Sequence, residues 1–537
     1  MKNLIKLIGF LLLTQIFYNT GFSEPHAIVK LKNQQAKITQ LPATVSKAEW
    51  NSIVGQINGV GTSEYQQNAY IKASNTNGGD QFGYSVAISG NTMVIGANKE
   101  DSNAMGVNNN QTNNAQISSG AAYVFVRNTN GIWAQQAYLK ASNTGNGDEF
   151  GFSVDISGDT IVVGAAFEDS NATGVNNDET NDLSIQSGAA YVFTRNAEIW
   201  SQQAYLKASN TSYTDWFGYS VAISGNTIVV GVIGEDSDVT GINNGTNELA
   251  ESSGAAYVFT RDLGEWSQQA FLKASNTEEI DWFGYSVDID DNTIVVGALH
   301  EDSNTTIING DEINNLAPSS GAVYVYTRTV DTWSQQAYLK PSNTGTGDRF
   351  GCSVAVSGNS LVIGAQFEAS NATGVGGIET NNDAIESGAA YIFSLTVGIW
   401  SQDAYLKASN TGGGDQFGYS VAVDNGSVMV GARYEDSNAV GVDGDGNNDL
   451  ISNSGAGYVY KKEAGTWSQH AYLKSFNTGN NDVFGFAVSV SGDNIVIGAE
   501  WESSNATGVN NEDNNLLPFS GSVYSFNKET IFVNGFE

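Results

Sequence analysis

The sequence predicts an all-β protein built from seven copies of one four-stranded unit. The first observation is a repeat of 66 to 68 residues, marked by Phe-Gly pairs that begin at Phe82, Phe150, Phe217, Phe283, Phe350, Phe417 and Phe484. The second is composition, because 61 glycines and only 5 prolines suit a β-rich chain with many tight turns. The third is an N-terminal segment that matches a strand missing from the last copy.

Each copy contains four apolar segments with the character of strands. In the first copy, residues 82–89 (FGYSVAIS) alternate bulky and small side chains with a period of two. Residues 92–97 (TMVIGA) form an unbroken apolar run, which is typical of a strand buried on both faces. Residues 120–125 (GAAYVF) are rich in β-branched and aromatic side chains, and a fourth segment begins at Trp133.

The two ends of the repeat indicate how the units are arranged. Residues 65–74 (YQQNAYIKAS) match the fourth segment of the first copy, 133–142 (WAQQAYLKAS), whereas the seventh copy ends at 523–526 (VYSF) without one. A linear solenoid would instead need distinct capping repeats at both ends. The sequence therefore predicts a closed seven-bladed β-propeller of four-stranded antiparallel blades, in which the N-terminal strand completes the last blade.

Residues 65–526 resemble the FG-GAP repeats of integrin α-subunit head domains and of related bacterial secreted proteins. The shared features are the Phe-Gly pair, a strand that ends in Gly-Ala, and a strand similar to GxVYVF. The resemblance implies the propeller fold and a role in adhesion or protein–protein recognition. Two features depart from it: no Gly-Ala pair is followed by proline, and short turns such as SGNT replace the family's calcium loop between the first and second strands.

The long loop between the second and third strands is the candidate metal site. A Glu occurs 18 residues after the Phe of each repeated Phe-Gly pair. Oxygen-bearing residues tend to recur 8, 10 and 14 positions after this Glu. The candidate ligands are Asp443, Asp445 and Asp449 in the sixth copy, Asn176, Asp178 and Asp182 in the second, and Asn309, Asp311 and Asn315 in the fourth. Ca²⁺ prefers six to eight oxygen ligands, so we expect these loops to bind calcium. The alternative is that Asn, Asp and Gly only form turns.

An aspartate stands two residues before every Phe-Gly pair, at Asp80, Asp148, Asp215, Asp281, Asp348, Asp415 and Asp482. These aspartates are either functional groups in several copies or turn residues that accept backbone N–H bonds. The aspartate occurs in all seven copies, although the candidate metal loops differ in sequence between blades. This favours the structural role. In a four-stranded blade they lie on the same rim as the long loops, so we expect most of the 57 acidic residues on one face. Phe82, Trp133 and their counterparts should pack between blades, and Gly83 should allow close backbone approach.

Charge and motif content exclude several function classes. With 57 acidic and 23 basic residues the net charge is −34, which repels nucleic acid and anionic lipid and favours cations and basic partners. None of the three histidines, His26, His300 and His470, belongs to the repeat, and the chain has no nucleophile elbow, zinc-ligand spacing or phosphate loop. Cys352 is predicted to be a small buried side chain. We expect no enzyme, although paired carboxylates leave a glycosidase-like site open.

The flanking segments suggest export. Residues 1–23 have the charged, apolar and small-residue layout of a signal peptide, and no later stretch is apolar enough to cross a membrane. Residues 24–64 are predicted to be a linker with a short helix near 46–57. The role of the tail, 527–537, is left open. We expect a secreted protein, extracellular or at the cell surface, with the periplasm as the alternative.

Together these features predict an exported, monomeric, non-enzymatic binding or adhesion protein. Its calcium-binding acidic face would recognise a protein or cell-surface ligand. The alternative is a lectin that binds carbohydrate in pockets repeated between blades, since such pockets suit weak multivalent binding.

Overall fold

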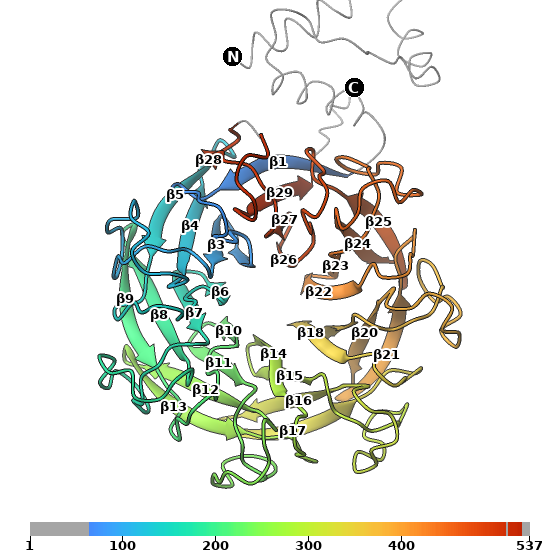
Figure 1. The fold of residues 1–537 in the computed structure, drawn as a ribbon. Helices are drawn as coiled ribbons and strands as arrows, with labels where there is room; N and C mark the ends of the chain where they lie inside the picture. Colours follow the sequence, from blue (N-terminus) through green and yellow to red (C-terminus); the bar gives the residue numbers. More distant parts are fainter. Residues whose placement is uncertain (1–63, 512–513, 529–537) are drawn as a thin grey trace, which may run out of the picture. The chain divides into compact units, whose positions relative to one another are not determined.

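The computed structural model describes residues 64–511 and 514–528, and every regular element within them is a β-strand. The strands form seven sheets arranged in a ring (Figure 1). This confirms the predicted seven-bladed propeller. The predicted signal peptide, the short helix near 46–57 and tail residues 529–537 lie outside the described residues. In the part of the chain that is described, no helix could span a membrane.

The blades follow one another along the chain, and in each the strand nearest the ring centre comes first (Figure 1). Blades one to three comprise β2 (Ser85–Ser89), β3 (Thr92–Ala97), β4 (Ala121–Arg127), β5 (Trp133–Leu139); β6 (Ser153–Ser157), β7 (Thr160–Ala165), β8 (Ala189–Asn196), β9 (Ile199–Leu206); and β10 (Ser220–Ser224), β11 (Thr227–Val232), β12 (Ala255–Asp262), β13 (Glu265–Leu272). Blades four to six comprise β14 (Phe283–Asp290), β15 (Thr293–Ala298), β16 (Ala322–Thr329), β17 (Thr332–Leu339); β18 (Phe350–Ser357), β19 (Ser360–Ala365), β20 (Ala389–Thr396), β21 (Ile399–Leu406); and β22 (Phe417–Asp424), β23 (Ser427–Ala432), β24 (Ala456–Glu463), β25 (Thr466–Leu473).

Blade seven is assembled from both ends of the propeller. It contains β26 (Ala487–Ser491), β27 (Asn494–Ala499), β29 (Ser522–Lys528) and, as its fourth long strand, β1 (Tyr65–Lys72). Strand β1 pairs antiparallel with β29, from Tyr65 opposite Lys528 to Ile71 opposite Val523, and the short β28 (Gly508–Val509) pairs with the end of β1. The predicted closure by the N-terminal strand is therefore confirmed. Strand β29 ends at Lys528.

Aromatic side chains and glycines at the blade junctions take the predicted roles. Phe82 and Trp133 of blade one belong to one buried apolar cluster with Val496 and Val523 of blade seven. A Cβ atom added to Gly83 would lie 2.5 Å from the carbonyl oxygen of Ser522, and the glycine has a φ of +95°. Only glycine tolerates both the contact and that conformation, so the Phe-Gly pair lets neighbouring blades approach closely.

A ring of aromatic side chains follows the first strands around the centre of the propeller. Five neighbouring pairs have ring centroids 5.0–5.3 Å apart: Tyr84–Phe152, Phe152–Tyr219, Tyr219–Tyr285, Tyr419–Phe486 and Phe486–Tyr84. Cys352 occupies the corresponding position of blade five and is buried, as predicted. Burial raises the pKa of its thiol to about 12, so the residue is a poor nucleophile.

Candidate functional site

The long loops and the segments that lead into the Phe-Gly pairs meet at one rim, which we call the loop rim. At the junction of blades one and two, Gly147 N–H donates to the Ile117 carbonyl at 3.0 Å, and Phe150 N–H donates to the Ser119 carbonyl at 3.0 Å. The same contact closes the ring, where Phe82 N–H donates to the Ser520 carbonyl at 3.1 Å. Each long loop thus supports the entry into the next blade.

The recurring aspartates of the loop rim are turn residues. Each accepts a hydrogen bond from the backbone N–H three positions earlier, as in Asp80 with Asn77 at 2.9 Å and Asp415 with Gly412 at 2.8 Å. The other five make the same bond at 2.6–3.0 Å: Asp148, Asp215, Asp281, Asp348 and Asp482. All seven are buried. The structural role favoured by the sequence is therefore confirmed.

Burial changes the acidity of these aspartates. Removal from water raises the pKa to about 8 for Asp80, Asp215 and Asp281 and to about 7 for Asp148, Asp348 and Asp415. The backbone hydrogen bond opposes the shift, and nearby glutamates add to it. The exposed charge of the rim is therefore smaller than the count of its acids suggests.

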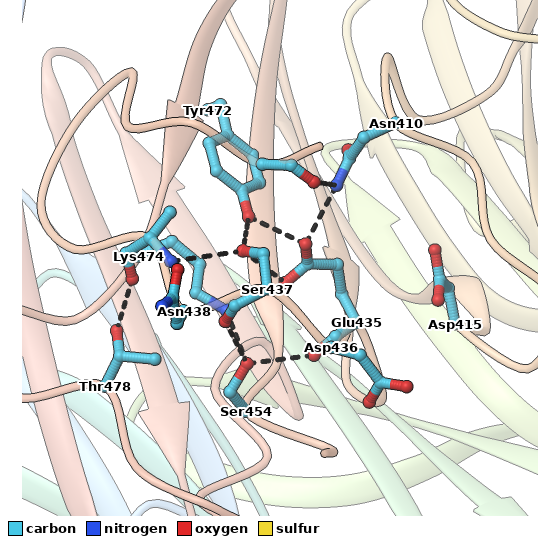
Figure 2. Close-up of polar contacts among 12 residues, drawn as sticks. Asn410, Asp415, Glu435, Asp436, Ser437, Asn438, Ser454, Tyr472, Lys474 and Thr478 are labelled. Atoms are coloured by element: carbon cyan, nitrogen blue, oxygen red, sulfur yellow. Dashed lines mark hydrogen bonds and ion pairs between the residues drawn. The ribbon is translucent and has the colours of Figure 1, made fainter. Parts of the chain in front are cut away.

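The recurring glutamates form a second buried group, which Figure 2 shows in blade six. The Glu435 carboxylate accepts hydrogen bonds from Tyr472 OH and Asn410 Nδ2, both at 2.8 Å, and pairs with Lys474 Nζ at 2.8 Å. Lys474 also donates to Ser454 Oγ at 2.7 Å. A buried carboxylate and a buried ammonium are tolerated here because each is paired and hydrogen-bonded.

The same buried ion pair occurs in every blade, with N–O distances of 2.8–3.0 Å. The pairs are Lys72–Glu502, Lys140–Glu100, Lys207–Glu168, Lys273–Glu235, Lys340–Glu301, Lys407–Glu368 and Lys474–Glu435. These glutamates stand at the start of the predicted metal loops, and their lysine partners were not predicted. A signal was present, because the Lys of the AYLKAS segment recurs in all seven copies of a chain with only 23 basic residues.

The first predicted metal ligand of each loop fastens the loop to the fourth strand. Asn176, Asn309 and Asp443 all have left-handed backbone conformations, with φ of 53–54°. Their side-chain oxygens accept the backbone N–H of Tyr205 at 2.9 Å, of Tyr338 at 2.8 Å and of Tyr472 at 3.0 Å, respectively. The residue therefore extends the sheet by mimicking a backbone acceptor.

The second predicted ligand forms a local turn, and the third is exposed. Asp178, Asp311 and Asp445 accept the backbone N–H two residues later, at 3.0, 3.3 and 3.1 Å. The third predicted ligands are exposed: Asp182, Asn315 and Asp449. The Asn315 side-chain amide donates a hydrogen bond to the Glu278 carboxylate.

Calcium binding by these loops stays a prediction. Beside the blade-six loop lies a shallow hollow of about 330 Å³, whose lining includes Asp443, Gly446, Asn447 and Tyr472. In the hydrogen bonds described above, Asp443 and Asp445 each use one carboxylate oxygen, which leaves one on each for a cation. Within residues 64–511 and 514–528, no three His, Cys, Asp or Glu side chains gather into a group that could hold a metal ion.

Every long loop also exposes a large aliphatic side chain, which was not predicted from the sequence. At least one such residue per blade has 64–76% of its surface exposed, and these residues include Ile117, Leu183, Leu249, Leu316, Ile385, Leu450 and Leu516. Several stand close in sequence to exposed acids, as Leu450 does to Asp449 and Leu183 to Asp182. The loop rim therefore combines negative charge with apolar contact surface.

Comparison with known families agrees with this architecture. A family model described as the FG-GAP repeat matches seven segments, which together cover well over half of the chain: 65–125, 133–193, 200–259, 266–326, 333–393, 400–460 and 467–526. A comparison with curated proteins finds no match.

Proposed function

The chain belongs to the FG-GAP repeat family, and we propose that it is an exported, non-enzymatic binding protein whose loop rim recognises a protein with a basic and partly apolar surface. FG-GAP propellers are typical of extracellular proteins and usually lack enzymatic activity. The family and the fold support a binding or adhesion role. The chemistry of the partner is argued from the rim itself.

The observation that carries the proposal is the pairing of exposed acids with exposed aliphatic side chains around the whole rim. The net charge of −34 favours a cationic partner through charge complementarity and faster encounter. Each of the seven buried ion pairs contains one Lys and one Glu, so these pairs leave the net charge at the surface unchanged. The exposed leucines and isoleucines of the rim supply apolar surface that such a partner would bury.

Calcium and export are further parts of the proposal. The remaining carboxylate oxygens of Asp443 and Asp445 would hold the ion in blade six, and the exposed Asp449 would add charge nearby. Calcium would stiffen the loop that presents Leu450, and so favour partner binding by reducing the entropy lost on association. Residues 1–23 would direct export.

The test uses the full chain and two synthetic peptides, one of alternating leucine and lysine and one in which serine replaces every leucine. We expect the leucine-containing peptide to bind more tightly and its affinity to fall with added salt. Replacing four rim leucines with serine (L183S, L249S, L316S and L450S) should weaken this binding at least tenfold.

A matched control changes four aliphatic residues that are 72–98% exposed and lie in or beside the turns between third and fourth strands: I199S, L263S, V330S and V397S. The control should bind the leucine-containing peptide like the unmodified protein. Equal affinities of the rim variant and the control, or equal binding of the two peptides, would contradict the proposal.

A further inference from the structure

The repeat is broken at two positions near the entry to each first strand. One is the residue between the aspartate and the Phe-Gly pair, which is Gln81, Glu149, Trp216, Trp282, Arg349, Gln416 or Val483. The other is the residue two after the second strand, which is Lys99, Phe167, Gly234, His300, Phe367, Tyr434 or Trp501. A binding site that occurs once in a sevenfold repeat must use positions that differ between blades. These positions are therefore where such a site is to be sought.

One hollow lies among these variable residues, at the junction of blades seven and one. Its volume is about 470 Å³, within the usual range for small-molecule sites, and it is lined by Gly79, Gln81, Lys99, Asn481, Trp501 and Phe519. The rings of Trp501 and Phe519 meet at 76° with centroids 5.8 Å apart, so they form a corner of two aromatic faces.

Phe519 is specific to blade seven. The other blades place Ser118, Gln186, Ser252, Ser319, Glu386 and Asn453 at the corresponding position. Phe519 is 49% exposed, and its φ of 57° is similar to the 50–56° of its six counterparts, so this conformation belongs to the turn of every blade. The feature particular to blade seven is the exposed aromatic side chain, which offers apolar contact surface at this position.

Polar groups border the aromatic corner. Gln81 and Asn481 bring side-chain amides, and no protein partner for the Gln81 amide occurs among the described residues. Lys99 brings an ammonium group that is paired with Glu149. Gly79 lines the hollow without a side chain, and a Cβ atom added there would meet no atom within 4 Å.

We propose that this hollow binds a neutral saccharide. A pyranose ring has a face of C–H groups bordered by hydroxyls, which matches an aromatic face bordered by amides and an amine. A neutral sugar is favoured over an acidic one because Glu149 already balances Lys99 and the whole chain carries a charge of −34. The site is single, unlike repeated pockets between blades, and it is separate from the rim leucines.

The experiment is saturation-transfer NMR on the full chain with glucose, galactose, mannose, N-acetylglucosamine and lactose as separate probes. We expect at least one of these sugars to receive saturation from the protein. Trp501→Ala and Phe519→Ser should each abolish the transfer or raise the Kd at least tenfold. Phe519 is half-exposed, so the second variant provides the test if the first does not fold.

Trp216→Ala is the matched control, because Trp216 also meets an aromatic residue edge-to-face, Phe167, at 6.2 Å. It should leave sugar binding unchanged. The proposal is overturned if no probe receives saturation, or if transfer survives both Trp501→Ala and Phe519→Ser. Binding of the leucine–lysine peptide by the two variants, measured in parallel, should stay unchanged and so separates this site from the exposed leucines of the loop rim.

Discussion

Lys72 Nζ lies 2.8 Å from the Glu502 carboxylate, and both side chains are fully buried although 430 residues separate them in the sequence. Lys72 ends the N-terminal strand β1, and Glu502 follows β27 of the last blade. The same buried ion pair that occurs inside blades one to six therefore also joins the two ends of the ring.

Replacing Lys72 with methionine should destabilise the propeller strongly. The change leaves the Glu502 carboxylate buried without its cationic partner, which typically costs about 3–5 kcal/mol. The double variant K72M/E502Q removes both charges and should recover much of the loss. Urea unfolding followed by tryptophan fluorescence measures both. If K72M unfolds at the same urea concentration as the unmodified protein, the pair does not hold the ring closed.

Stability should fall as the pH rises from about 4 to about 8. The pKa values of six buried aspartates are raised from 3.8 to about 7 or 8 in the folded protein, so the unfolded chain binds fewer protons across this range. Folding is then favoured on the acidic side and loses stability as the pH increases through the folded pKa values. Thermal melts at half-unit intervals of pH measure the slope.

The variant Asp415→Asn tests this origin, because asparagine can still accept the Gly412 N–H but carries no charge. At pH 8 it should be more stable than the unmodified protein by at least about 1 kcal/mol, and at pH 4 the two should be similar. Asp445→Asn, at an exposed aspartate of the same blade, is the control and should keep the original pH dependence. If Asp415→Asn has the same dependence of stability on pH as the unmodified protein, other groups cause the loss of stability at high pH.

The sequence sufficed for the fold because the features that determine it are repeated and local. Period-two alternation in 82–89 and the apolar run 92–97 predict strands whatever lies around them, and seven copies repeat both patterns. The match between 65–74 and 133–142 predicted the closing strand for the same reason. The bond of Asp415 to Gly412 spans three residues, so its turn role could also be inferred locally.

The site was harder to predict because its contacts join distant segments. Glu435 binds Lys474, which is 39 residues away in the sequence, and from its residue type alone each would be predicted to be an ordinary surface charge. Burial also cannot be read from residue type, so Asp80 and Asp445 look alike in sequence although one is buried and the other exposed. The hollow beside Trp501 and Phe519 forms only when blade seven closes against blade one.

Gly96→Ala should destabilise the protein by at least about 2 kcal/mol, because close packing leaves no space for a methyl group at this position. A Cβ atom there would lie 2.0 Å from the carbonyl oxygen of Gly151 in the next blade, and a backbone atom cannot move aside cheaply. Gly413→Ala is the control, since its nearest contact would be 3.5 Å. It should be neutral or stabilising by up to about 1 kcal/mol. Similar urea midpoints for the two variants would contradict the close approach of blades one and two.

Calcium should raise the melting temperature of the full chain in a saturable manner relative to EDTA. An ion that binds only the folded loops stabilises by mass action, by about 2.7 kcal/mol at a concentration one hundred times the Kd. The double variant D443N/D445N should reduce this rise. Asparagine already occupies the position of Asp443 in blades two and four, where Asn176 and Asn309 make the same bond to the fourth strand, so the substitution removes charge and keeps the loop structure.

The control for calcium is Asp262→Asn, at an exposed residue that ends β12 and lies outside the long loops. It should keep the full calcium-dependent rise. If D443N/D445N keeps the full calcium-dependent rise in melting temperature, the ion does not bind at blade six. Equal melting temperatures in EDTA and in calcium would show that the Asp443 and Asp445 carboxylates serve only the turns, because a ligand that favours the folded state must raise its stability. The rim would then have to bind its basic partner by charge and apolar contact alone.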